Sequence, residues 1–230
     1  MTTRHEHQTF EGLVDRGGSA YEDIELRRCT FRSCAFGITY DPNQRSVARR
    51  IRLTACGTEG LVIRTGVFED VTIDGLRTRG LLQVWAGAYR HVTLRGRIGR
   101  IMLSRLVEPS QATVAQQAAF DRANRDFYQQ TDWAIDITEA EFEEFEPGGV
   151  PGDLIRRDPR DTALVLRERA QAGAWRSLDL SDTPWDIALS DIATGMLPSE
   201  VLVAPRRHRK YRRLVEGLDL LKEHGIAHPD

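Results

Sequence analysis

The 230-residue chain has few of the features that mark exported, membrane-inserted or metal-binding proteins. Its three cysteines, Cys29, Cys34 and Cys56, include no CxxC pair, and an odd number this small fits neither a disulfide framework nor a four-ligand zinc site. The apolar runs are only a handful of residues long, and the first ten residues lack the apolar core of a signal peptide. These absences predict a cytoplasmic protein that binds no membrane, no metal and no cofactor.

Lysine is also scarce, because Lys210 and Lys222 are the only lysines among the 32 basic residues. Arginine is therefore the general basic residue here, and an arginine by itself is weak evidence for a ligand. The charge is divided unevenly, since residues 1–105 hold 17 Arg and 11 Asp or Glu, a net charge of +6. Residues 106–230 hold 15 basic and 23 acidic residues, a net charge of −8. Two halves of opposite sign predict two regions.

An apolar pattern with a period of five residues runs through the first half of the chain. Pairs of apolar or small residues separated by one position begin at residues 24, 29 and 34, and the same phase returns at 51, 61, 66, 71, 87 and 92. The residue between the two members of a pair points outward in a strand. The blocks that begin at Ile24, Ile51, Val71 and Val92 are 27, 20 and 21 residues apart. This spacing predicts stacked coils with four five-residue sides, and residues 37–46 form an insertion in the longest step.

The outward residues of the predicted coils form columns of alternating charge. Stacking the coils aligns Glu22, Arg49, Glu69 and Arg90 in one column and Asp23, Arg50, Asp70 and His91 in the next. Neighbouring strands lie roughly 4.8 Å apart, so opposite charges in adjacent coils attract one another. The inner apolar phase and the outer charge phase therefore predict the same register.

The segment ELRRCTFRSCAFG, residues 25–37, resembles a short run of pentapeptide repeats. In that family a small residue or cysteine and, two positions later, Leu or Phe point inward. The resemblance implies a right-handed quadrilateral β-helix, and a more general β-helix is the alternative. The repeat is clear over residues 22–36 and degenerate over 47–104, where Arg97 and Gly99 fall at expected inner positions. We expect a one-residue slip near Leu82 or Ile98 to account for this departure.

The pattern changes to a helical period over residues 110–130. One apolar face is formed by Ala115, Ala119, Phe120, Ala123 and Phe127. Ser110 is the candidate N-cap. The five-residue phase resumes at Ile135 and continues to Phe145, so residues 133–150 are expected to stack on the coil built around Val92. The sequence thus predicts a β-helix over residues 1–150, interrupted at about 107–131 by a helix whose apolar face covers the side or end of the coils.

Residues 151–230 predict a small α/β C-terminal region. The expected order is a strand at 163–166, a helix at 168–174, a helix opened by Thr183 and Pro184, a strand at 201–203 and a final helix that ends before Gly225. An apolar stripe on the final helix is expected to pack on the β-helix end or on its own short sheet. The predicted fold class is therefore mainly β, a right-handed β-helix with an inserted α-helix and a small α/β C-terminal region.

The strongest candidate site is a cationic cluster just before the final predicted helix. It consists of Arg206, Arg207, His208, Arg209 and Lys210. Positive charge at a helix N-terminus opposes the macrodipole, whereas free N–H groups together with arginines make a good anion site. We hypothesise that the cluster binds an anion or a partner. The alternative is a solvated face, or salt bridges to the acidic half of the chain.

The other titratable groups are better explained as structure, and no catalytic residue is assigned. Several of the five glutamates between residues 139 and 146 alternate with inward apolar residues, as on a solvated strand face, so neither catalysis nor metal binding is expected there. The three cysteines continue the inner phase and are expected to be buried thiols. Asp70 and His91 are explained as a surface pair.

These observations predict a non-enzymatic binding protein whose rigid β-helix surface contacts another protein. An immunity or resistance role fits this architecture by analogy at the level of the fold. Some pentapeptide-repeat proteins resemble duplex DNA and bind topoisomerases, but the positive charge of residues 1–105 argues against such mimicry. One alternative is a carbohydrate-active enzyme on a β-helix, which needs clustered acids on neighbouring coils. The other is a nucleic-acid binder through arginine-rich surfaces, and the acidic remainder of the chain weighs against it.

Overall fold

The computed structural model describes residues 1–108 and 110–228, and most of its regular structure is β-strand. One large sheet contains β1 (Thr3–Glu6), β2 (Thr9–Glu11), β3 (Ala20–Arg27), β4 (Thr30–Arg32), β5 (Ala35–Phe36), β6 (Val47–Glu59), β7 (Val62–Ile63), β8 (Val67–Glu69), β9 (Thr72–Trp85), β10 (Ala88–Arg90), β11 (Val92–Ser104), β12 (Ile135–Asp136), β13 (Ala140–Pro147) and β14 (Ile155–Arg156). A small sheet contains β15 (Thr162–Leu166), β16 (Ser199–Val203) and β17 (Ala227–His228). The helices are α1 (Val114–Tyr128), α2 (Arg167–Ala172), α3 (Trp185–Thr194) and α4 (Tyr211–Glu223), with short 3-10 turns at Pro42–Gln44, Gly152–Leu154 and Ala174–Ser177.

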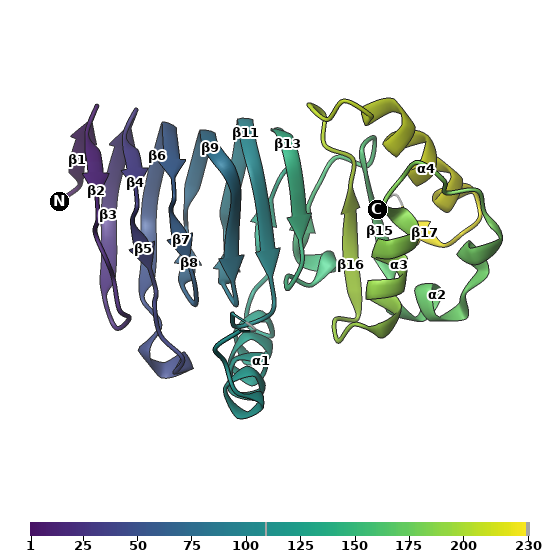
Figure 1. Cartoon of the computed structure of the whole chain (residues 1–230), viewed down its shortest axis with the longest axis horizontal. Helices are drawn as coiled ribbons and strands as arrows, with labels where there is room; N and C mark the ends of the chain where they lie inside the picture. Colours follow the sequence, from purple (N-terminus) through teal and green to yellow (C-terminus); the bar gives the residue numbers. More distant parts are fainter. Residues whose placement is uncertain (109, 229–230) are drawn as a thin grey trace.

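The strands of the large sheet follow one another from the N-terminus toward the middle of the molecule (Figure 1). The small sheet and helices α2, α3 and α4 lie beyond β13, at the opposite end from the N-terminus, while α1 lies against one side. We refer to residues 157–228 as the C-terminal region. None of the helices in the described ranges has the length and apolar character needed to cross a membrane.

All strand pairs in the described part of the large sheet are parallel, and their registers repeat the spacing predicted from the sequence. Ala20 pairs with Val47, Val47 with Val67, and Val67 with Ala88, so paired residues are 27, 20 and 21 positions apart. The longer step contains residues 37–46, which lie between β5 and β6. The predicted insertion is therefore confirmed.

The predicted charge columns are also confirmed. Glu22 pairs in register with Arg49, Arg49 with Glu69, and Glu69 with Arg90. The Arg49 guanidinium lies 2.6 Å from the Glu69 carboxylate and 3.1 Å from that of Glu22. In the next column, Arg50 binds Asp23 at 2.7 Å and His91 lies 3.1 Å from Asp70. Exposed pairs of this kind each contribute about 1 kcal/mol or less, so their main effect is to favour one register.

Left-handed backbone conformations recur every five residues along the large sheet. They occur in runs at residues 7 and 12, at 23, 28 and 33, at 50, 55 and 60, at 70, 75 and 80, and at 86, 91 and 96. Several of these residues are not glycine, including Arg28, Ala55 and Ala86, with φ between 44° and 52°. A left-handed residue that carries a Cβ costs about 1 kcal/mol or more. Stacking against neighbouring strands must offset this cost at each turn.

Small and apolar side chains stack in the interior of the large sheet. Cys56 pairs with Leu76, Leu76 with Ile98, and Ile98 with Phe142, and all four are buried. All three cysteines are buried free thiols, as predicted, and burial raises the pKa of Cys56. The register shifts on both sides of Ile98, which buries this side chain while the preceding Arg97 is exposed. The predicted slip near Ile98 is confirmed.

Helix α1 begins later than predicted, and Ser110 is not its N-cap. The N-cap is Thr113, whose hydroxyl accepts a hydrogen bond from the Gln116 backbone N–H, while the Gln116 side chain accepts one from the Thr113 N–H. This capping box satisfies two donors at once, which one serine at position 110 does not. Phe120 is fully buried against Ala86 and Val107, so α1 covers a side of the large sheet.

After α1 the chain returns to the large sheet, as predicted. Val92 pairs with Ile135, and Gly96 with Ala140. The sheet then continues past residue 150, because Ile135 also pairs with Ile155 in β14. The predicted boundary at residue 150 thus falls before the last strand of the large sheet.

The small sheet covers the end of the large one. In β16, Val201 and Val203 pack into the core of the large sheet, while Leu202 packs with the helices of the C-terminal region. The apolar stripe of α4 packs with that second core, so it lies on its own short sheet, which was one of the two predicted placements. Helix α2 ends earlier than expected because Gly173 adopts φ 77°, and residue 174 begins a 3-10 turn instead.

Candidate functional site

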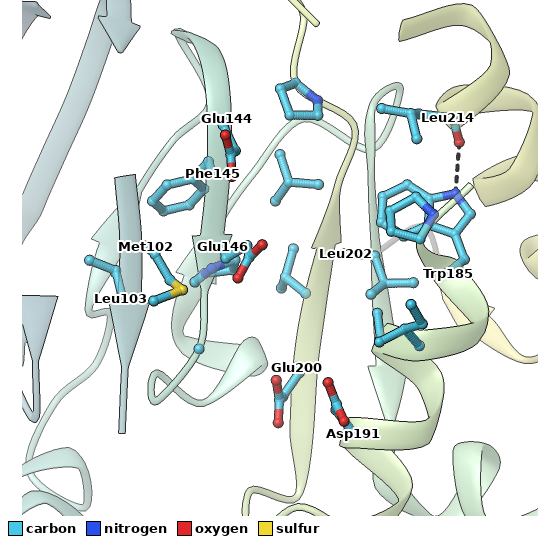
Figure 2. Close-up of a pocket in the computed structure, with 18 of the residues that line it drawn as sticks. Met102, Leu103, Glu144, Phe145, Glu146, Trp185, Asp191, Glu200, Leu202 and Leu214 are labelled. Atoms are coloured by element: carbon cyan, nitrogen blue, oxygen red, sulfur yellow. Dashed lines mark hydrogen bonds between the residues drawn. The ribbon is translucent and has the colours of Figure 1, made fainter. Parts of the chain in front are cut away.

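A cavity of about 870 Å³ lies where the large sheet meets the C-terminal region. Strands β11 and β13 form one wall, and β16 and α3 form the other (Figure 2). We call this cavity the cleft. Residues of β16 pack both in the core of the large sheet and in the core of the C-terminal region. This packing fixes the positions of the two walls of the cleft.

Much of the cleft lining is apolar. Met102 and Leu106 come from β11 and the segment after it, Phe145 from β13, and Ile187 from α3. Ile187 is 66% exposed, although Leu189 and Ile192 of the same helix are buried. Exposed apolar side chains that gather beside a cavity are typical of binding surfaces.

Five carboxylates line the cleft, of which Glu144 pairs with Arg100 and Asp182 with Lys210, and the other three come from three different elements. They are Glu146 of β13, Asp191 of α3 and Glu200 of β16. Figure 2 shows Asp191 and Glu200 side by side at one end of the cleft, with Glu146 across from β16. Within residues 1–108 and 110–228, none of the three forms an ion pair.

The pKa values of two of these carboxylates are raised. Burial raises the pKa of Glu200, and the charge of Asp191 raises it further, although Arg105 partly opposes this. Burial also raises the pKa of Glu146, together with the charges of Glu144 and Asp191. The Arg105 guanidinium is held by Asp121 at 2.8 Å, so it does not serve as a counter-ion to Glu200. Raised carboxylate pKa values in a cavity are typical of functional sites.

The sequence assigned the whole acidic run at residues 139–146 to a solvated face. This holds for Glu141, which is exposed near Arg97, and Glu144 is ion-paired with Arg100 at 2.6 Å. Glu144 and Glu146 both line the cleft, and Glu146 has no ion pair among the described residues. A strand shows the same alternation of polar and apolar residues whether its polar face meets solvent or a cavity. The sequence of β13 alone therefore cannot show that Glu146 lies in the cleft.

Arg206 of the predicted cationic cluster is held inside the C-terminal region. Its guanidinium lies 2.8 Å from the Asp158 carboxylate and also forms an ion pair with Asp161. Both aspartates are buried, and hydrogen bonds from Arg160, helped by the charge of Arg206, lower the pKa of Asp158 to about 2. Arg206 therefore has a structural role.

Arg207 fastens the C-terminal region to the large sheet. Its backbone N–H donates to the Phe142 carbonyl at 3.0 Å, and its side chain donates to the Ile98 carbonyl at 3.2 Å. These two bonds cross from the segment after β16 to strands β13 and β11. Salt bridges to the acidic half of the chain, which were one of the alternative explanations of the cluster, thus account for Arg206, whereas Arg207 is held by hydrogen bonds to two backbone carbonyls.

The remaining three residues of the cluster, His208, Arg209 and Lys210, line the cleft. His208 Nδ1 accepts a hydrogen bond from the Lys210 backbone N–H, and the Lys210 ammonium lies 3.7 Å from the Asp182 carboxylate. Arg209 is exposed and has no ion pair or hydrogen bond among the described residues. The cluster does precede a helix, since Lys210 is the N-cap of α4.

A second titratable cluster lies on the outside of the large sheet. His91 Nε2 lies 2.6 Å from Asp132 and Nδ1 3.1 Å from Asp70, and the His91 ring packs on Trp133. Hydrogen bonding to Asp132 and then to Asp70 raises the pKa of His91. The predicted pair of Asp70 and His91 is present, and the return of the chain after α1 adds Asp132.

No group of three or more metal-ligating side chains is arranged to hold a metal ion in the described part of the chain. A comparison with models of known protein families gives no match. No curated protein matches the sequence either. Function is therefore inferred from the geometry of the molecule.

Proposed function

We propose that the large sheet is coiled into a right-handed β-helix of the pentapeptide-repeat type. Three observations support this fold. Residues paired across the sheet are about one predicted coil apart, left-handed turns recur every five residues, and small or apolar side chains stack in one interior column. A flat sheet needs no left-handed residue at every fifth position, whereas a four-sided coil turns at each of them.

We further propose that the protein is a non-enzymatic binding protein and that its partner is another protein. The cleft carries this proposal, because it combines exposed apolar side chains with unpaired charges between two walls that are held rigidly. Apolar surface with a charged rim is typical of protein interfaces. An immunity or resistance role, in which the bound partner is a toxin or the target of a poison, is consistent with this architecture by analogy.

Affinity capture from the native lysate tests this function. Ile187→Asp places a charge on the apolar wall of the cleft, and Val114→Asp is the matched control, because Val114 is equally apolar, exposed and helical but lies outside the cleft. We expect one protein to be retained by the wild type and the control and lost with Ile187→Asp. Calorimetry with the purified partner should then show similar affinities for the wild type and the control and a much weaker affinity for Ile187→Asp. A partner that binds all three proteins equally would refute the cleft as the binding surface.

A carbohydrate-active enzyme is the second candidate, because Glu146 and Glu200 are carboxylates with raised pKa values in one cleft. Cleavage of any member of a panel of polysaccharides, by hydrolysis or by elimination, would favour this candidate if Glu200→Gln abolished it. Inactivity of the wild type on the whole panel would count against it. The nucleic-acid alternative gains no support from the charge columns, since Arg49, Arg50 and Arg90 are paired with carboxylates.

A further inference from the structure

We propose that the cleft takes a segment of the partner protein that places an arginine or lysine against Glu146, Asp191 and Glu200, with large apolar side chains beside it. This inference rests on the proposed protein-binding function and adds the chemistry of the partner. It predicts which side chains a binding segment must contain.

The charge of the cleft selects a cation. Glu146 and Glu200 come from two elements, and burial together with the charge of Asp191 from a third element raises the pKa of both. The described chain supplies none of them with an ion pair, because Arg105 is bound to Asp121 and Arg100 to Glu144. A bound cation would attract these carboxylates and offset the repulsion between them.

The apolar walls select a side chain with an alkyl stem rather than a bare ion. Leu106 and Ile187 offer no ligand to a metal ion, but together with Met102 they can contact the methylene groups of an arginine or lysine and the apolar residues next to it. A volume of about 870 Å³ lies within the usual range for sites that enclose several such groups.

The basic residues of the cleft do not oppose this occupant, because Arg105 is bound to Asp121 and the others lie at the far end. Glu200 is the second residue of β16, whereas Arg209 and Lys210 follow the end of that strand. Figure 1 shows the segment after β16 on the opposite side of the molecule from the connection between α3 and β16. The charge of Lys210 is also partly balanced by Asp182. The cleft thus has an acidic end, formed by Asp191 and Glu200, and a basic end.

Selection of random dodecapeptides displayed on phage against the full chain tests this inference. We expect the enriched peptides to share an arginine or lysine flanked by leucine, isoleucine or aromatic residues. Glu146→Gln combined with Glu200→Gln should weaken binding of a synthetic enriched peptide by about tenfold or more. The double variant should keep or raise its melting temperature, so that weaker binding does not reflect unfolding. Glu141→Gln, on the same strand but outside the cleft, should bind like the wild type.

The outcomes separate this inference from the function on which it rests. Enriched peptides that are acidic, or that bind the double variant as tightly as the wild type, would overturn the basic segment and leave protein binding at the cleft in place. Failure to enrich any peptide, or enrichment of peptides whose binding is unaffected by Ile187→Asp, would overturn both.

Discussion

The charged side chains of the large sheet and those of the cleft are arranged in opposite ways. On the sheet, Glu22, Arg49, Glu69 and Arg90 alternate in sign at neighbouring register positions, and each charge has a partner. In the cleft, Glu146, Asp191 and Glu200 have no ion-pair partner among the described residues. The first arrangement stabilises the native register, while the second costs stability. Such a cost is usual where the arrangement serves binding, so the comparison separates scaffold from site.

The largest expected effect comes from removing the buried ion pairs of Arg206. Arg206→Ala leaves Asp161 buried without its partner and Asp158 with Arg160 alone, and should lower the free energy of unfolding by about 3 kcal/mol. Urea denaturation measures this loss. Arg209→Ala is the control from the same cluster and should change stability by less than about 0.5 kcal/mol. Equal losses for the two variants would contradict the division of the cluster into structural and free residues.

Neutralising a carboxylate of the cleft should have the opposite sign. Glu200→Gln removes repulsion with Asp191 and should raise the free energy of unfolding by about 1 kcal/mol at neutral pH. Because the folded state raises the pKa of Glu200, it binds the proton more tightly than the unfolded chain. Wild-type stability should therefore fall as pH rises from the unfolded value of 4.5 through the raised folded pKa, and the advantage of the variant should appear over that interval. A destabilised variant at pH 7 would show that Glu200 has a favourable partner after all.

His91 gives a smaller effect with a defined pH dependence. Its pKa is raised by Asp132 and Asp70, so its contribution is fully present below the unfolded value of 6.5 and is lost as pH rises through the folded pKa. His91→Gln should cost about 0.5 kcal/mol at pH 5.5, since the pairs are largely exposed, and close to nothing at pH 9. NMR titration of the imidazole gives the folded pKa directly, and a value below 6.5 would contradict the expected stabilisation.

A single pair from a charge column should give the smallest effect. In a double-mutant cycle with Arg49→Gln and Glu69→Gln, we expect a coupling free energy of about 0.5 kcal/mol. Thermal denaturation of the four proteins in low and in high salt measures it, and salt should reduce it. A coupling of several kcal/mol would mean that the columns stabilise the fold rather than mainly select its register.

The parts of the fold that could be predicted from the sequence are those governed by a local period. The spacing of apolar pairs placed Ile24 and Ile51 opposite one another on neighbouring strands, and the same phase at Ile135 predicted the return of the chain after α1. The start of α1 was predicted at the wrong residue, because Ser110 was chosen as the N-cap. A capping box needs a Glu or Gln three residues after the N-cap, and Gln116 stands at that position relative to Thr113.

The cleft could not be predicted in the same way. Glu146, Asp191 and Glu200 are brought together by the packing of β16 on the large sheet, and residues 146 and 200 are far apart in sequence. The cationic cluster was found because it is contiguous, but its division into structural and cleft-lining residues depends on Asp158 and Asp161, which no spacing connects to it.

Two segments leave the large sheet and return to it without disturbing the strands around them. Residues 37–46 separate β5 from β6, and the excursion that contains α1 separates β11 from β12. Each rejoins the neighbouring strand in register, as Ala20 with Val47 and Val92 with Ile135. Closing a longer loop costs only about 0.6 kcal/mol for each doubling of its length. Residues 37–46 do not line the cleft, so this point is a natural grafting site where a segment can be lengthened or exchanged, whereas Arg105 and Leu106 of the second excursion line the cleft.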